Sequence, residues 1–115
     1  MRDRDTIERL MQIAKAVGRG ELPLYQHKEL FTAGAFDLVV FNSNDKGVLF
    51  ELLSDLCAEY ECVKSNEKEL SGFIYLLEAA SRSTGTTELP SGMERIIREN
   101  PEKTGALREW YRLRG

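Results

Sequence analysis

The sequence has no long hydrophobic run. None of its apolar stretches approaches the roughly 18 to 20 residues that a membrane-spanning helix needs. Its first ten residues, MRDRDTIERL, are charged and contain no apolar segment of the kind found in signal peptides. With 42% hydrophobic and 30% charged residues in a chain of 115, the composition is that of one soluble globular domain. We therefore expect a single domain, 1–115, in the cytoplasm and away from membranes.

Cysteine and histidine, the usual ligands of structural zinc sites, are also scarce. The two cysteines, Cys57 and Cys62, are five positions apart, whereas structural metal sites use four ligands, usually with closer pairs. On one helix, an offset of five turns two side chains about 140° apart, which disfavours a disulfide bond. We expect two buried, reduced thiols, no bound metal and no cofactor.

Catalytic motifs are missing as well. His27 is the only histidine, and no serine or cysteine motif accompanies it to form a nucleophile and base. The spacings GxSxG, HExxH and the Walker glycine pattern do not occur. We therefore expect His27 to be a surface or packing residue and the protein not to be an enzyme.

The chain has no dominant positive charge. Its net charge is −3, and only the segment 93–115 is basic, with six basic and four acidic residues. Five arginines there could contact phosphates in a helix-turn-helix protein: Arg95, Arg98, Arg108, Arg112 and Arg114. Glutamates interleave with them, and Glu94 lies four residues before Arg98, the spacing of a pair within a helix. The sequence therefore predicts no binding to nucleic acid.

Hydrophobic residues recur with the period of an α-helix. In the first segment Ile7, Leu10, Met11, Ala14 and Val17 share one face, and Gly18 or Gly20 ends the helix. The same period predicts further helices over 46–60, from 66 to about 81–85, over 91–100 and 104–113, and a buried helix following Pro23. In the helix that begins at Asn66, an apolar stripe is expected to face the core: Leu70, Phe73, Ile74 and Leu77. Its stretch FDLVVF could form a strand by propensity, but no second strand is available to pair with it. We predict an all-α fold of five or six short amphipathic helices in stacked antiparallel pairs.

Polar residues mark where these helices should begin and end. Asn66 with Glu69, and Ser91 with Glu94, have the spacing of a capping box at a helix start. Asn100 followed by Pro101 predicts the end of the helix that Ser91 begins.

One predicted helix is acidic. Residues 47–63 contain no lysine or arginine but four carboxylates, of which Glu51, Asp55 and Glu59 recur at intervals of four. One interpretation is a solvated face balanced by basic groups from a neighbouring helix; the other is a docking surface for a basic partner. On the second interpretation the partner-binding residues are Asp37, Asp45, Glu51, Asp55, Glu59 and Glu61.

A resemblance favours the docking interpretation. The segment FIYLLEAASRS followed by TGTTELPSGMERIIRENP, from Phe73 to Pro101, resembles the C-terminal half of immunity proteins that accompany bacterial polymorphic toxins, particularly those of contact-dependent growth inhibition. The resemblance implies a non-catalytic cytoplasmic protein that binds the basic C-terminal domain of its cognate protein toxin, often a nuclease, and covers its active site. The alternative is a helical interaction or adaptor domain with an unrelated partner.

Overall fold

The structure, a computed structural model, describes residues 4–21, 46–84 and 87–113. These residues form helices and no strand, which confirms the predicted all-α fold. The helices are α1 (Arg4–Gly18), α4 (Lys46–Ala58), α5 (Tyr60–Val63), α6 (Glu67–Thr84), α7 (Met93–Glu99) and α8 (Gly105–Trp110). The helix predicted after Pro23, the stretch FDLVVF and His27 lie outside the described residues.

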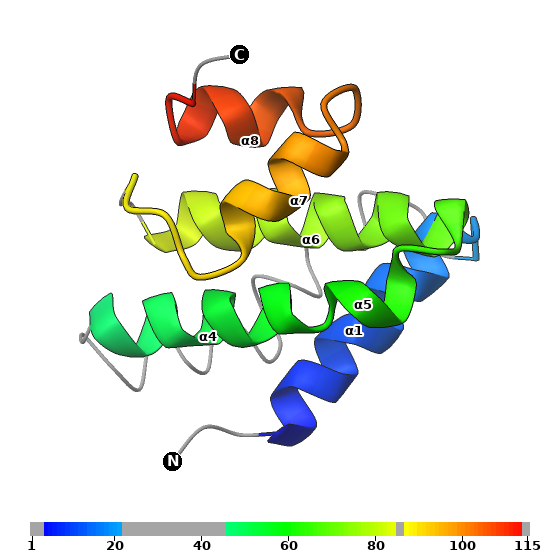
Figure 1. The fold of residues 1–115 in the computed structure, drawn as a ribbon. Helices are drawn as coiled ribbons and strands as arrows, with labels where there is room; N and C mark the ends of the chain where they lie inside the picture. Colours follow the sequence, from blue (N-terminus) through cyan, green and yellow to red (C-terminus); the bar gives the residue numbers. More distant parts are fainter. Residues whose placement is uncertain (1–3, 22–45, 85–86, 114–115) are drawn as a thin grey trace.

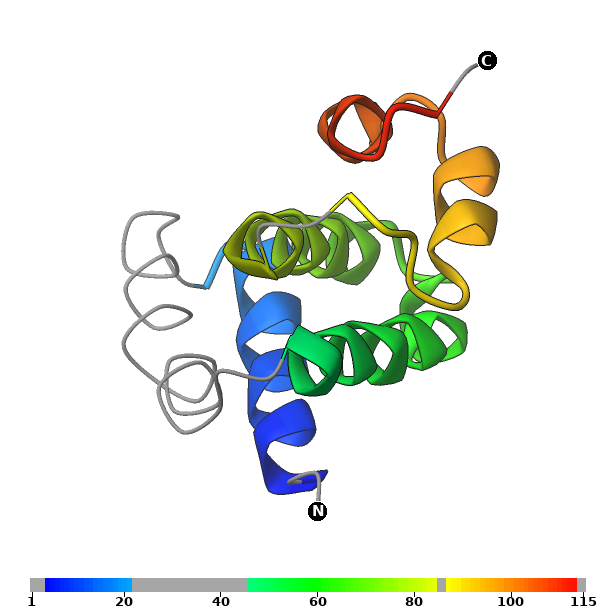
Figure 2. The same ribbon diagram turned by 90° about the vertical axis from the view of Figure 1, so that its left-hand side faces the viewer.

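Helix α6 is the centre of the arrangement. It contacts α1, α4, α5 and α8, and it runs antiparallel to α4 (Figure 1). Helix α1 crosses one side of the α4–α6 pair, and α7 and α8 lie on the other side (Figure 2). The helices therefore stack in layers, as the predicted array of short helices requires.

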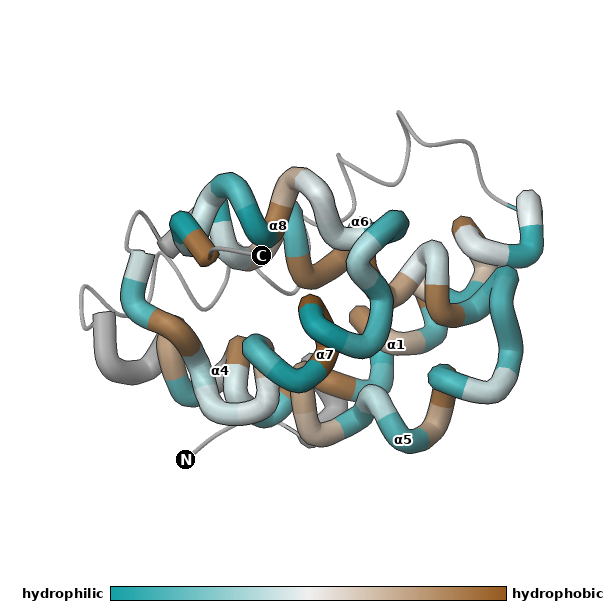
Figure 3. The backbone as a smooth tube through the Cα atoms, turned by 45° about the horizontal axis from the view of Figure 1, so that its top comes forward, coloured by the Kyte–Doolittle hydropathy of each residue, from teal (hydrophilic) through white to brown (hydrophobic). Residues whose placement is uncertain are grey.

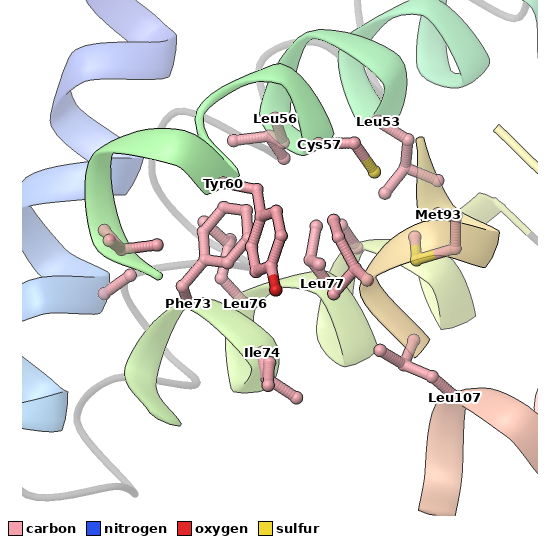
Figure 4. Packing of buried hydrophobic residues seen from close by; sticks show 14 of the residues in the cluster. Leu53, Leu56, Cys57, Tyr60, Phe73, Ile74, Leu76, Leu77, Met93 and Leu107 are labelled. Atoms are coloured by element: carbon pink, nitrogen blue, oxygen red, sulfur yellow. The ribbon is translucent and has the colours of Figure 1, made fainter. Parts of the chain in front are cut away.

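Among the described residues, one hydrophobic cluster joins the six helices. The stripe predicted on α6 is buried: Leu70, Phe73, Ile74 and Leu77 are each at most 5% exposed. Figure 4 shows Cys57 on the side of α4 that faces α6, with Met93 of α7 beside it. Hydrophobic and hydrophilic residues alternate along the helices (Figure 3), because each helix buries one side and exposes the other.

Two glycines allow α1 and α6 to meet backbone to backbone. A Cβ atom on Gly72 would lie 1.8 Å from the carbonyl oxygen of Ala14, and one on Gly18 would lie 1.8 Å from that of Lys68. Real Cβ contacts essentially never fall below 3.0 Å. Any side chain at either position would therefore push the two helices apart.

Helices α1 and α8 end in the same hydrogen-bond motif. After α1, the N–H of Glu21 donates to the carbonyl of Ala16 and that of Gly20 to Val17, with Gly20 at φ 80°. After α8, the N–H of Leu113 donates to the carbonyl of Arg108, and Arg112 takes the equivalent position at φ 56°. This is the Schellman motif, which favours glycine at the left-handed position; α8 has an arginine there.

Of the two predicted capping boxes, the one at Asn66 is confirmed and the one at Ser91 is wrong. The backbone N–H of Glu69 donates to Oδ1 of Asn66 at 3.1 Å, which confirms the cap of α6. The cap at Ser91 is wrong: the residue that precedes α7 is Gly92, at φ 88°, and it makes no side-chain cap bond. Pro90 accepts from the N–H of Met93 at 3.1 Å, so Ser91 and Gly92 are the central residues of a tight turn that requires the glycine. Asn100 ends α7 as predicted.

Candidate partner-binding surface

The predicted acidic residues of α4 lie on the side opposite its buried face. Leu53, Leu56 and Cys57 are 0 to 4% exposed and face the core. Glu51 is exposed, and Asp55 is partly exposed one helical turn further along. Glu59, in the turn that joins α4 to α5, is also partly exposed. We call Glu51, Asp55 and Glu59 the acidic face.

Small side chains continue the exposed stripe of α4 into α5. Ala58 and Cys62 follow Asp55 at intervals of three and four, and both are exposed. The prediction that both cysteines are buried is therefore wrong for Cys62, because this position faces outward with Asp55 and Ala58. Both thiols are free, as predicted. Burial raises the pKa of the Cys57 thiol from 9.0 to about 12.

Glu61 forms two ion pairs, one with Arg95 of α7 and one with Lys64 at the end of α5. Its Oε1 lies 2.7 Å from Nη1 of Arg95, and its Oε2 lies 2.9 Å from Nζ of Lys64. Hydrogen bonds from Lys64, and then from Arg95, hold the pKa of Glu61 below its usual value. A basic group from a neighbouring helix thus balances this carboxylate, as in the first interpretation of the acidic helix.

Arg95 belongs to a polar cluster that joins α5 to α7. The Tyr60 hydroxyl donates to Oε1 of Glu99 at 2.7 Å and accepts from Nδ2 of Asn100 at 3.1 Å. The Arg95 guanidinium lies 5.4 Å from the centre of the Tyr60 ring, and its Nε donates to Oε2 of Glu99 at 3.0 Å. The cluster fixes the end of the α4–α5 segment against α7.

Protonation in this cluster is set by the same contacts. Burial, and then the hydrogen bond to Glu99, raises the pKa of Tyr60. The hydrogen bond from Tyr60, and then that from Arg95, lowers the pKa of Glu99. Both shifts favour a neutral phenol that donates to an ionised carboxylate.

Besides Arg95, three basic residues near the C-terminus have acceptors within the protein. Arg98 pairs with Glu94 at 2.7 Å, as their spacing predicts, and Lys103 lies 3.4 Å from a carboxylate oxygen of Glu67. Arg108 donates to the carbonyl of Pro101 at 3.1 Å. A phosphate-binding surface would present such cations outward to its ligand. Here, as with Arg95, carboxylate or carbonyl oxygens of the protein itself contact them.

Two predicted site residues, Asp37 and Asp45, lie outside the described residues. Within residues 4–21, 46–84 and 87–113, no group of three or more His, Cys, Asp or Glu side chains could hold a metal ion. In the same part of the chain, no helix combines the length and apolarity needed to cross a bilayer.

No protein-family model, curated protein sequence or solved structure matches this chain. The function therefore has to be inferred from the residues and their arrangement.

Proposed function

We propose that this chain is an immunity protein that binds a cognate toxin domain, a nuclease, and covers its active site. The observation that carries the proposal is the acidic face, three carboxylates on a segment without lysine or arginine. The resemblance of residues 73–101 to toxin immunity proteins supports the same function. The protein would act in the cytoplasm, without catalysis or a cofactor.

The negative charge of the acidic face is complementary to the positive charge expected on a nuclease. A nuclease grips phosphates with basic side chains, so carboxylates on a helix can occupy the region where its substrate's charge would lie. Opposite charges on two proteins raise the association rate, by roughly tenfold to a thousandfold at low salt. The effect weakens as salt shortens the range of the attraction.

The core beneath α4 supports the docking role. Leu53, Leu56 and Cys57 anchor the buried side of the helix, so the outward carboxylates sit on a firmly packed element. A preorganised surface loses less conformational entropy on binding than a loop does. Exposed charges act mainly on the association rate, and desolvated anchors would supply most of the affinity.

The first test is protection from the toxin. We expect a gene for a secreted toxin beside the gene for this chain, and the C-terminal domain of that toxin would be expressed in a host with and without the chain. We expect the chain to restore growth and to co-purify with the toxin domain. Failure to protect the host would refute the immunity function, whereas binding without protection would support the alternative of an adaptor domain.

The second test concerns the acidic face. In the triple variant Glu51→Lys, Asp55→Lys and Glu59→Lys, we expect association with the toxin domain to slow by at least about tenfold at low salt, with little change in thermal stability. A control with the same change in net charge carries lysine at three exposed carboxylates elsewhere: Glu88, Glu102 and Glu109. It should bind within about threefold of the wild type, because its charges change away from the acidic face. Equal binding by both variants and the wild type would show that the acidic face is only solvated.

A further inference from the structure

We draw no further inference here: the strongest candidate, the exposed stripe of α4 and α5 formed by Glu51, Asp55, Ala58 and Cys62, belongs to the surface already proposed to bind the toxin, and no second feature of the described residues points to another ligand there.

Discussion

Replacing Gly72 by alanine should destabilise the protein, although alanine is the better helix former. In an exposed helix interior the exchange would stabilise by about 1 kcal/mol. Here the new Cβ would lie 1.8 Å from the carbonyl oxygen of Ala14 and 2.8 Å from the amide nitrogen of Gly18. Both are backbone atoms, so no change of rotamer can relieve the contact.

The magnitude follows from the movement that the contact requires. The distance to the Ala14 oxygen must grow from 1.8 Å to at least 3.0 Å, which moves α1 away from α6. Ala14 and Leu10 of α1, and Phe73 of α6, are fully buried in the cluster that this movement would open. Overpacking costs about 1 to 3 kcal/mol, and lost core contacts add to it. We expect a net loss of about 2 to 3 kcal/mol, or roughly 8 to 12 °C in Tm.

Gly105 provides a matched control for the same substitution. It begins α8, is exposed, and a Cβ there would meet nothing within 4 Å. Thermal and urea unfolding followed by circular dichroism should show Gly105→Ala as stable as the wild type or slightly more so. If Gly72→Ala unfolds at the wild-type temperature, the helices do not meet through their backbones.

A double variant sharpens this test. Gly18→Ala should destabilise to a similar extent, because its Cβ would lie 1.8 Å from the Lys68 carbonyl oxygen across the same crossing. Once one alanine has separated the helices, the second meets less obstruction. The loss in the double variant should therefore be smaller than the sum of the single losses, and strict additivity would contradict a shared contact.

Three further changes test the helix ends and the buried polar groups. Arg112→Gly should stabilise by about 0.5 to 1 kcal/mol in urea unfolding, because glycine adopts φ 56° without steric cost; a loss would contradict the left-handed cap. Tyr60→Phe should cost about 1 kcal/mol, because Asn100 and Glu99 lose the hydroxyl; an unchanged midpoint would mean that water replaces it fully. The raised pKa of Cys57 means that the unfolded state loses its thiol proton first, so stability falls as pH rises from 9.0 towards about 12. Cys57→Ala should remove about 2 kcal/mol of this decline by about pH 10.5, and an identical pH profile would contradict burial of the thiol.

Hydrophobic spacing and capping residues predicted the helices well, because helix formation depends largely on residues that are neighbours in the chain. The spacing of Leu70, Phe73, Ile74 and Leu77 identified the buried side of α6, and Asn66 identified its start. Each of these features is decided within one or two helical turns.

The prediction of a capping box at Ser91 was wrong because a tertiary contact determines where α7 begins. Its spacing to Glu94 fitted the motif, but Gly92 adopts φ 88° in the turn before the helix. A Cβ on Gly92 would lie 3.3 Å from the Cβ of Cys57, so the turn packs closely on α4. Glu94 pairs with Arg98 on the outer side of α7. The sequence Pro-Ser-Gly contained a turn signal that could have predicted this start.

For the candidate site, sequence patterns predicted which residues share one side of a helix but not which residues pair between helices. Helical spacing placed Glu51 and Asp55 on the same side of one helix, and the structure shows both with exposed surface. Helical spacing could not predict that Glu61 pairs with Arg95, because that contact joins two helices far apart in the sequence.

The ion pairs of Glu61 determine how this carboxylate can be used in binding. A partner that docks on Glu61 must compete with Arg95 and Lys64, both of which already hold its oxygens. Reversing its charge would also disturb Arg95, which bonds to Glu99 and lies over Tyr60. Loss of binding in a Glu61 variant could then arise from a shift of α7 rather than from a lost contact with the toxin. The test of the proposed surface therefore uses Glu51, Asp55 and Glu59, which define the acidic face, and leaves Glu61 unchanged.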